Sequence, residues 1–225
     1  MRGLLMLLVV ALLAACTSMQ ELLARRQPPE LGFRYGELLF EDGFETGAEW
    51  RAYETSADLY LDVRAGAFRI EFSGRQYVWS QRAGQHRNVV IEAESRQVSE
   101  FDHNAYGLAC RLDPANSGRG YFFLISGDGH ASIRWSNGRS LKPIVAAAPS
   151  AHIRQGQTGN RLRVLCIDDY LALWVNGRFV ADARDGRSGQ GEVGLVGVMN
   201  YAGARLAVEF DDISVWRAAL DLRES

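Results

Sequence analysis

The chain carries two pairs of carboxylates whose spacing suits chemistry on one face of a β-strand. Glu92 and Glu94 stand two residues apart in "VIEAES", and Glu209 and Asp211 stand two residues apart in "VEFDDI". Two carboxylates that flank a glycosidic bond can catalyse its hydrolysis. Neither run holds a third acidic residue on the same face, and the Glu92 and Glu94 pair is also typical of the solvated face of a strand.

The other residue types that commonly carry catalysis are scattered along the chain. No G-x-S-x-G sequence is present to form a nucleophile elbow, and the histidines have no spacing typical of metal ligands. We expect most of these histidines on the surface or in loops; they are His86, His103, His130 and His152. The sequence therefore assigns no catalytic residue.

The first residues have the layout of an export signal. In residues 1–15, Arg2 precedes the apolar run "LLMLLVVALLAA", which is too short for a comfortable membrane span. The pattern Leu13-Ala14-Ala15-Cys16 resembles the lipobox of bacterial lipoproteins, in which the cysteine is acylated and becomes the new N-terminus. This resemblance implies an extracytoplasmic protein anchored in a bacterial membrane through Cys16, and Thr17 in place of Asp implies the outer membrane of a Gram-negative cell. The alternative is a plain signal peptide in which Cys16 is incidental.

Residues 16–36 are polar and contain Pro28-Pro29, as is typical of a flexible tether. We expect one domain over 37–217 and a C-terminal tail over 218–225. The formal net charge of the chain is −2, and removal of the signal takes away Arg2 and no acidic residue, which leaves −3. Such a charge does not favour nucleic acid as a partner, because phosphates are neutralised by a basic face.

From residue 38 onward the chain consists of short alternating or apolar runs separated by Gly, Asn and Asp, without a sustained helical period. Asn176-Gly177 lies between two such runs and favours a type I′ hairpin. Asp168-Asp169 and Asn137-Gly138 mark further turns. So many strands favour an all-β sandwich of two antiparallel sheets, because a single open sheet would leave apolar faces in water. The predicted strands are 38–41, 59–63, 67–72, 77–81, 88–98, 105–112, 120–126, 131–136, 161–167, 170–176, 178–184, 192–199 and 205–216.

The order of these runs supports a family resemblance. The motifs are "LLFEDGFETGAEW", "YGLACR", "GYFFLISGDGHASIRW", "RLRVLCIDDYLALWVNGRFVADARD", "GEVGLVGV" and "VEFDDISVW". Over residues 38–216 the chain resembles the concanavalin A-like lectin/glucanase jelly roll, in the branch related to laminin-G-like and 3-keto-disaccharide-hydrolase-type domains. The resemblance implies a jelly-roll β-sandwich. Laminarinase-type enzymes on this fold carry an E-x-D-x-x-E strand, which this sequence lacks.

Two cysteines remain once Cys16 is assigned to lipid. Cys110 and Cys166 each lie inside a predicted strand, and an even pair outside the cytoplasm is most simply explained by a disulfide. The family resemblance implies that the two strands are neighbours. The alternative is two buried free thiols, and metal binding is disfavoured because the chain has no C-x-x-C sequence.

Aromatic and polar residues on the predicted strands are candidates for ligand binding. Alternation places Trp174 on the face opposite Leu173, so this ring leaves the core if Leu173 is buried. The same alternation separates Arg134 from Trp135. The candidates for a sugar-facing surface are Tyr121, Trp135 and Trp174, with Asp128 and Arg134 as polar neighbours. The alternative is that these rings are core or rim packing.

Calcium is a second possible ligand, and no organic cofactor is implied. Asp42, Glu45, Asp211 and Asp212 lie near the two ends of the domain, which we expect to pair, and Ca²⁺ prefers oxygen ligands of this kind. The alternative is that these are turn residues that accept hydrogen bonds from the backbone.

Three functional classes stay open for the protein. We expect a lipid-anchored envelope protein whose domain binds a glycan or another envelope component without catalysis. The first alternative is a glycoside hydrolase of the 3-keto-disaccharide type, which the resemblance implies. The second alternative is a structural lipoprotein that binds an envelope protein.

Overall fold

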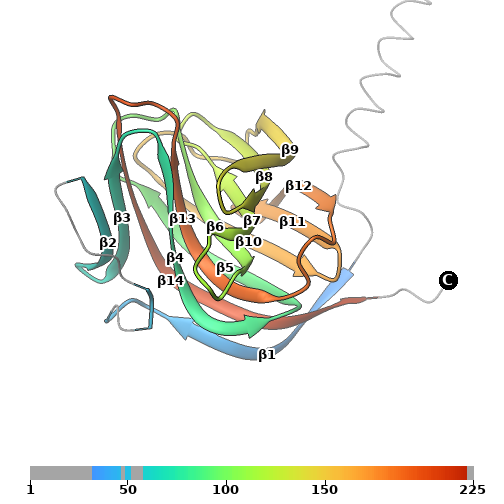
Figure 1. The fold of residues 1–225 in the computed structure, drawn as a ribbon. Helices are drawn as coiled ribbons and strands as arrows, with labels where there is room; N and C mark the ends of the chain where they lie inside the picture. Colours follow the sequence, from blue (N-terminus) through green and yellow to red (C-terminus); the bar gives the residue numbers. More distant parts are fainter. Residues whose placement is uncertain (1–31, 47–48, 52–57, 222–225) are drawn as a thin grey trace, which may run out of the picture. The chain divides into compact units, whose positions relative to one another are not determined.

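The computed structural model describes residues 32–46, 49–51 and 58–221 (Figure 1). The predicted signal peptide, the lipidation site Cys16 and most of the predicted tether lie outside these residues. Within the described part of the chain, no helix is long and apolar enough to cross a membrane.

The described residues form fourteen β-strands and no helix. The strands are β1 (Gly32–Asp42), β2 (Leu59–Arg64), β3 (Ala67–Ser73), β4 (Gln76–His86), β5 (Val89–Gln97), β6 (Asn104–Leu112), β7 (Arg119–Ile125), β8 (His130–Asn137), β9 (Leu141–Pro149), β10 (Gly159–Ile167), β11 (Tyr170–Val175), β12 (Arg178–Arg184), β13 (Gly191–Met199) and β14 (Arg205–Asp221).

The strands make two antiparallel sheets that pack face to face. The eight-stranded sheet has the order β12-β11-β10-β5-β14-β3-β2, and β1 also pairs with β14. The six-stranded sheet has the order β4-β13-β6-β7-β8-β9 and faces the viewer in Figure 1. The prediction of an all-β sandwich of two antiparallel sheets is confirmed.

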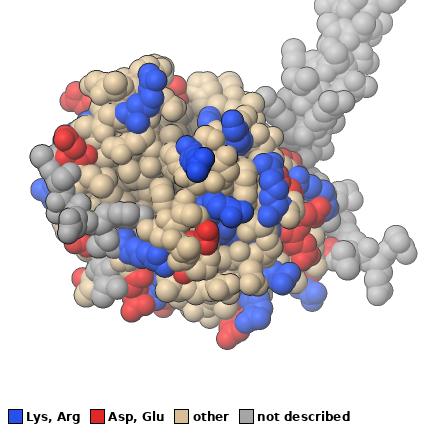
Figure 2. All heavy atoms as spheres, viewed as in Figure 1, with Lys and Arg blue, Asp and Glu red and all other residues tan. Residues whose placement is uncertain are grey.

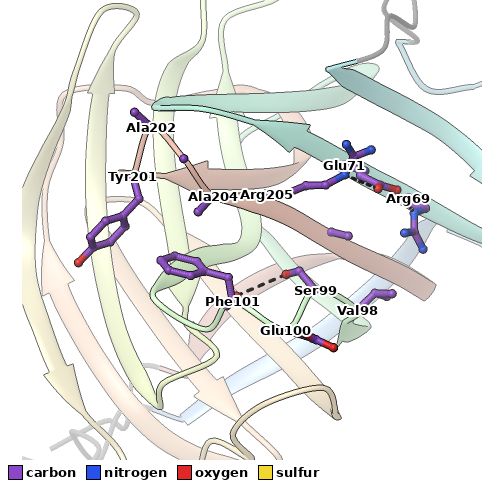
Figure 3. A pocket seen from close by; sticks show the side chains of 12 residues that line it. Arg69, Glu71, Val98, Ser99, Glu100, Phe101, Tyr201, Ala202, Ala204 and Arg205 are labelled. Atoms are coloured by element: carbon purple, nitrogen blue, oxygen red, sulfur yellow. Dashed lines mark hydrogen bonds and ion pairs between the residues drawn. The ribbon is translucent and has the colours of Figure 1, made fainter.

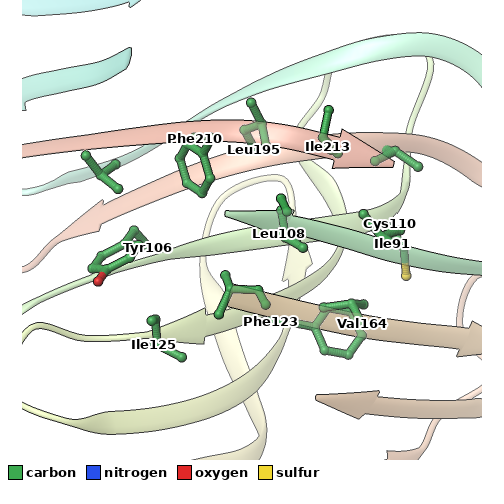
Figure 4. Close-up of a cluster of buried hydrophobic side chains, with 14 of the residues drawn as sticks. Ile91, Tyr106, Leu108, Cys110, Phe123, Ile125, Val164, Leu195, Phe210 and Ile213 are labelled. Atoms are coloured by element: carbon green, nitrogen blue, oxygen red, sulfur yellow. The ribbon is translucent and has the colours of Figure 1, made fainter. Parts of the chain in front are cut away.

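Alternation along the strands builds the core between the sheets. In β3, buried residues alternate with partly exposed ones, and Phe68, Ile70 and Phe72 are the buried set. Successive side chains of a strand point to opposite faces, so one face of each sheet can be apolar throughout. Figure 4 shows the middle of this core, where Ile91, Val164 and Phe210 of the eight-stranded sheet pack with Tyr106, Leu108 and Phe123 of the six-stranded sheet.

Local turn chemistry correctly predicts one hairpin, and one strand was missed. Asn176 and Gly177 have φ angles of 52° and 75° between β11 and β12, as the predicted type I′ turn requires. Strand β9 was not predicted, because Pro143 and Pro149 interrupt an alanine-rich run. Proline has no amide hydrogen to donate, and β9 accommodates it as an edge strand that pairs on one side, with β8.

The described domain extends beyond both predicted boundaries. Strand β1 begins at Gly32, five residues before the predicted start at 37, and β14 continues to Asp221 in the predicted tail. The two strands pair from Gly32 opposite Asp221 to Asp42 opposite Ile213. Backbone hydrogen bonds between them therefore order residues that look like linker in the sequence.

A disulfide links the two sheets through the core. Cys110 of β6 and Cys166 of β10 are bonded, with their Cα atoms 6.8 Å apart. The expectation that the two strands are neighbours is wrong, because β6 and β10 belong to opposite sheets. Both cysteines lie on the core face of their strands and are fully buried, so the bond crosses the sandwich.

Candidate functional site

The outward face of the six-stranded sheet, here called the hollow face, is the most distinctive surface of the domain. Its buried side chains form an apolar cluster separate from the main core: Ala109, Leu112, Phe122, Leu124, Val196 and Val198. Figure 2, in the view of Figure 1, shows a depression here, with basic side chains more prominent than acidic ones in the middle of the view. Oη of Tyr77 on β4 lies 3.4 Å from Oγ of Ser136 on β8, four places along the sheet, so the sheet curves toward this face and shelters it.

Two aromatic rings lie stacked at one side of the hollow face. Strand β4 alternates so that Tyr77 and Trp79 pack on the hollow face, and Val78 is part of the main core. The ring centroids of Tyr77 and Trp79 are 5.6 Å apart with planes inclined by 27°, and Phe122 meets Tyr77 edge-on at 6.0 Å. Both Tyr77 and Trp79 remain partly exposed. An aromatic pair of this kind can stack on the apolar face of a sugar ring.

The β6–β7 loop sets the position of Trp79. The Nε1 atom of Trp79 donates hydrogen bonds to Oδ1 of Asn116 in this loop at 2.9 Å and to Oε1 of Gln81 at 3.1 Å. Gly118 has a φ of 71°, and a Cβ atom there would lie 2.7 Å from the Trp79 ring. Glycine at 118 is therefore needed both for the backbone conformation and for the space that the ring occupies.

A cavity of about 280 Å³ lies on the same sheet, where β7 ends and β8 begins. Its walls include Leu124 of the apolar cluster, Ala105 packed against that cluster, and Tyr201 from the loop after β13. Two of the predicted ligand-binding residues, Asp128 and Arg134, line this cavity together.

Asp128 holds the turn between β7 and β8. Its Oδ1 atom accepts a short hydrogen bond from Oγ of Ser126 and lies 3.1 Å from Nδ1 of His130, and its Oδ2 atom lies 2.8 Å from Nδ1 of His103. Burial alone would raise the pKa of Asp128, but the hydrogen bonds from Ser126, His130 and His103 lower it overall. Both carboxylate oxygens are therefore already engaged by this cluster.

Arg134 is half-buried in the cavity and has little compensation for its charge. Its Nε atom donates a hydrogen bond to Oγ of Ser132 at 3.2 Å, and no carboxylate of the described residues is within ion-pair distance. Removal from water lowers the pKa of the Arg134 guanidinium, because burial disfavours the charged form. The cavity thus contains a partly desolvated cation without a counterion from the described chain.

The structure does not support two of the three predicted aromatic candidates. Tyr121 is fully buried, Trp135 is 8 % exposed, and both belong to the main core with ring centroids 4.8 Å apart. They are cross-strand neighbours of β7 and β8 on the face that also carries Ile133. The hydroxyl of Tyr121 donates to the backbone oxygen of Asp185 at 3.0 Å. Tyr121 is therefore a packing residue, whereas Trp135 is a mostly buried core residue whose edge lines a cavity of about 210 Å³ away from Asp128.

Trp174 leaves the main core, as alternation predicts, but lies on the other sheet. Leu173 is fully buried in the core, and Trp174 packs on the outward face of the eight-stranded sheet. It belongs to a chain of five contacting rings, here called the aromatic row: Phe179, Trp174, Phe33, Tyr35 and Trp216. Phe33 and Tyr35 come from β1, which pairs with β14 in the same sheet. Trp174 therefore cannot act together with Asp128 and Arg134.

Three of the four carboxylates in the predicted pairs, Glu92, Glu94 and Glu209, form ion pairs on the eight-stranded sheet. Glu92 is 6 % exposed and accepts hydrogen bonds from Oη of Tyr35 at 2.5 Å and from Nε of Arg163 at 2.6 Å. The expectation of a solvated strand face is wrong for this residue, because β1 places Tyr35 on Glu92. Burial alone would raise the pKa of Glu92, but bonds from Tyr35, Arg161 and Arg163 lower it overall. These carboxylates are not presented to the hollow face.

The predicted calcium ligands do not form a suitable set. Strands β1 and β14 pair as expected, but Asp42 accepts hydrogen bonds from the amide of Phe44 at 2.7 Å and from Nε1 of Trp50 at 2.9 Å, and Arg82 lies 3.1 Å away. Asp211 accepts a hydrogen bond from the amide of its neighbour Asp212. The described residues contain no group of three or more His, Cys, Asp or Glu side chains that could hold a metal ion.

A larger, shallower cavity of about 690 Å³ lies between the β5–β6 and β13–β14 loops. Figure 3 shows Phe101 and Tyr201 on one side and Arg69, Glu71 and Arg205 on the other. Glu71 accepts from Nε of Arg69 and from Nε of Arg205, each at 2.6 Å. The charges of this cavity neutralise one another, so the smaller cavity with Arg134 is the stronger candidate for a ligand.

Sequence reasoning found Asp128 and Arg134 but missed the other residues that line the hollow face. The missed side chains are Tyr77, Trp79, His103, His130 and Tyr201. A signal for the first two was present, because alternation in "YVWSQ" puts Tyr77 and Trp79 on one strand face. Tyr201 and His103 lie in loops, where alternation gives no information.

Comparison with known proteins gives matches at the level of structure alone. No protein-family model matches the chain, and no curated protein sequence matches it. The carbohydrate-binding module CBM66 from Bacillus subtilis has a TM-score of 0.61 and 16% identity, over 76% of this chain and 97% of the module. A Bacillus subtilis protein of unknown function with a galectin-like fold has a TM-score of 0.61 and 11% identity, over 84% of this chain and 99% of its own.

Glycoside hydrolases share the same architecture. A β-1,3-1,4-glucanase (lichenase) derived from a mouse hindgut metagenome has a TM-score of 0.58 and 8% identity, over 79% of this chain and 98% of the enzyme. At such identities the likeness establishes the fold and nothing finer. The two sheets, their order and these neighbours together show that the chain has the concanavalin A-like lectin/glucanase jelly-roll fold.

Proposed function

We propose that this protein is a lipid-anchored envelope protein whose hollow face binds a glycan without catalysis. The observation that carries the proposal is the sheltered hollow face, where a stacked aromatic pair and a polar cavity occur on one sheet. Ligand sites in proteins combine apolar walls with a few well-placed polar groups in this way. The presence of a carbohydrate-binding module among the structural neighbours supports the same ligand class.

Binding is favoured over hydrolysis by the carboxylates that the cavity contains. Among the described residues that line it, Asp128 is the single acidic side chain, and its oxygens are engaged by Ser126, His103 and His130. Glycoside hydrolysis generally uses two carboxylates on either side of the scissile bond. The cavity therefore offers recognition groups without the usual catalytic pair.

The binding proposal is tested with the purified chain carrying Cys16→Ser, so that acylation does not interfere. A panel of oligosaccharides is titrated by calorimetry, and the same mixtures are assayed for released sugar. We expect one glycan class to bind without turnover, and Trp79→Ala to weaken its binding about tenfold or more, as for other central aromatic contacts. Trp174→Ala is the matched control on the other sheet and should bind normally.

Each outcome of this experiment has a definite meaning. Binding that depends on Trp174 and not on Trp79 would move the site to the aromatic row. If the parent releases sugar and Asp128→Asn does not, the function is hydrolysis and not binding alone. A folded protein that binds no member of the panel would favour the third class, a structural lipoprotein, to be tested by cross-linking to envelope proteins.

The anchoring proposal has a separate test that does not depend on the ligand. The pattern Leu13-Ala14-Ala15-Cys16 supports acylation of Cys16, and Thr17 supports transfer to the outer membrane. We expect the chain to incorporate labelled palmitate and to sediment with outer membranes when produced in a Gram-negative host. The Cys16→Ser variant should lose the label, and a labelled Cys16→Ser chain would show that acylation occurs elsewhere.

A further inference from the structure

We propose that the cavity on the hollow face selects an acidic glycan, whose oxyanion binds the guanidinium of Arg134. The inference rests on the proposed function, since it names the chemical class of the ligand that the hollow face holds.

Most of the N–H groups of the Arg134 guanidinium have no hydrogen-bond partner in the described chain. A guanidinium carries five N–H donors in a planar fork. Within the described chain, Nε of Arg134 donates to Oγ of Ser132 at 3.2 Å, and neither Nη atom has a protein acceptor. These outer N–H groups form the edge that matches two oxygens of a carboxylate, a sulfate or a phosphate.

The carboxylate of Asp128, although it lines the same cavity, does not compensate the positive charge of Arg134. Asp128 lines the same cavity, but its carboxylate is occupied by Ser126, His103 and His130. His103 and His130 both contact the carboxylate of Asp128, so this carboxylate does not neutralise Arg134. Arg134 is therefore the uncompensated charge of the cavity. An anionic ligand would supply the missing counterion.

Arginines of the eight-stranded sheet differ from Arg134 because they have carboxylate partners. In the cavity of Figure 3, Arg69 contacts Glu71 at 2.6 Å and Glu209 at 2.8 Å, and Arg205 contacts Glu71 at 2.6 Å. The sheltered Arg69, which is 13% exposed, and the exposed Arg205 are thus both provided with carboxylates by the protein itself. Arg134 is half-buried and has none, which is the arrangement expected of a binding group.

The surroundings of Arg134 strengthen its attraction for an anion. Leu124, Ala105 and Ala147 line the cavity beside it, and apolar walls lower the local dielectric constant. Basic side chains are also more prominent than acidic ones over the middle of this face in Figure 2. Tyr201, which is 50% exposed at the edge of the cavity, adds a ring beside which the neutral part of a sugar can lie.

The test uses matched ligand pairs that differ in charge alone. Oligomers of galacturonic, glucuronic and mannuronic acid are each titrated beside their carboxyl-reduced, neutral forms, and a maltooligosaccharide is titrated beside its 6-phosphate. We expect the full chain carrying Cys16→Ser to bind at least one acidic member about tenfold more tightly than its neutral partner, the usual effect of a charge-assisted contact. The pair that shows the preference also tells whether the oxyanion is a carboxylate or a phosphate.

The variants assign the preference to Arg134. Arg134→Gln should reduce the preference to about twofold or less, and Arg134→Lys should restore part of it as a point charge. The matched control is Arg205→Gln, an arginine of the Figure 3 cavity, which should keep the full preference. Melting temperatures of all variants establish that they are folded.

Three results would overturn the proposal in distinguishable ways. Equal affinity for acidic and neutral partners would refute the selection of anions and leave glycan binding intact. A preference that survives Arg134→Gln would refute the assigned site. Failure of every acidic and neutral ligand to bind a folded chain would refute the proposed function and this inference with it.

Discussion

The outward faces of the two sheets differ in how they treat charge and aromatic surface. On the eight-stranded sheet, Arg69 and Arg163 are paired with carboxylates, and rings of β1 pack with Trp174 and Trp216 in the aromatic row. On the hollow face, Arg134 has no carboxylate partner among the described residues, and the rings of Tyr77 and Trp79 stay partly exposed. The arginines named on the eight-stranded sheet have counterions from the chain itself. Arg134 on the hollow face has none among the described residues, and an anionic ligand could supply one. We propose that this difference separates residues that stabilise the fold from residues that bind the ligand.

The largest expected effect is the difference in stability between two variants, one that removes Arg69 from the eight-stranded sheet and one that removes Arg134 from the hollow face. Arg69 is 13% exposed and joins Glu71 to Glu209, so Arg69→Met should lower the free energy of unfolding by about 2–3 kcal/mol through loss of charged hydrogen bonds. Arg134→Met removes a charge without a counterion and keeps the volume of the side chain. It should leave the stability unchanged or raise it by up to about 1 kcal/mol.

Urea unfolding of the two arginine variants measures this difference directly. A loss of stability in Arg134→Met as large as that in Arg69→Met would mean that Arg134 has a structural role. The distinction between the two faces would then fail at its central residue.

The next effect concerns the aromatic row. Trp174→Ala should lower the free energy of unfolding by about 2 kcal/mol, because the ring packs at 5.7 Å from Phe33 and 5.5 Å from Phe179 and is only partly buried. Trp174→Phe should retain most of this stability. Ligand titration should show the same affinity for all three proteins. A Trp174→Ala protein of normal stability and weakened binding would show that the eight-stranded sheet carries the ligand site.

A smaller effect is expected from two glycines with similar backbone conformations. Gly118 and Gly66 have φ angles of 71° and 79°, so alanine at either position should cost about 1–2 kcal/mol for the left-handed conformation. A Cβ atom at 118 would also displace the ring of Trp79, whereas nothing lies within 4 Å of a Cβ at 66. We therefore expect Gly118→Ala to weaken ligand binding and Gly66→Ala to leave it unchanged, as measured by calorimetry. Equal affinities would argue against Trp79 as a ligand contact.

The sequence predicts best what depends on neighbours along the chain. The hairpin at Asn176-Gly177 follows from turn chemistry, and the sandwich follows from the number of alternating runs. Strand β9 was missed because Pro143 disfavours a strand unless the strand lies at an edge, and edge position depends on pairing between distant segments. The start of β1 was missed for the same reason, since its partner β14 is nearly the whole chain away.

The candidate site was predicted in part for a related reason. Alternation divides a strand into two faces but does not say which face meets the core, so Trp135 was proposed as a ligand contact although it shares the core face with Ile133. Asp128 and Arg134 were chosen as polar neighbours, and the turn between β7 and β8 brings them to one cavity. Tyr77 and Trp79 reach this sheet through pairing of β4 with β13, which no local pattern encodes.

The smallest effect is a difference in how stability depends on pH. Burial alone would raise the pKa of Glu71 on the eight-stranded sheet, but bonds from Arg69 and Arg205 lower it overall. A lowered carboxyl pKa stabilises the fold above the ordinary value of about 4.3 and loses this contribution as the pH falls through the lowered pKa. Glu71→Gln should therefore be less stable than the parent at pH 7, and the difference should shrink as the pH falls below about 4.3.

Arg134 provides the contrasting pH profile, because an arginine stays protonated throughout this range. In urea unfolding, Arg134→Gln should be at least as stable as the parent at both pH 7 and pH 3, because Arg134 has no ion pair that acidification could break. A loss of stability that appears only at neutral pH would mean that a carboxylate of the chain compensates Arg134 after all. The hollow face would then be completed by the protein, as the eight-stranded sheet is, and an anionic ligand would have no charge left to neutralise.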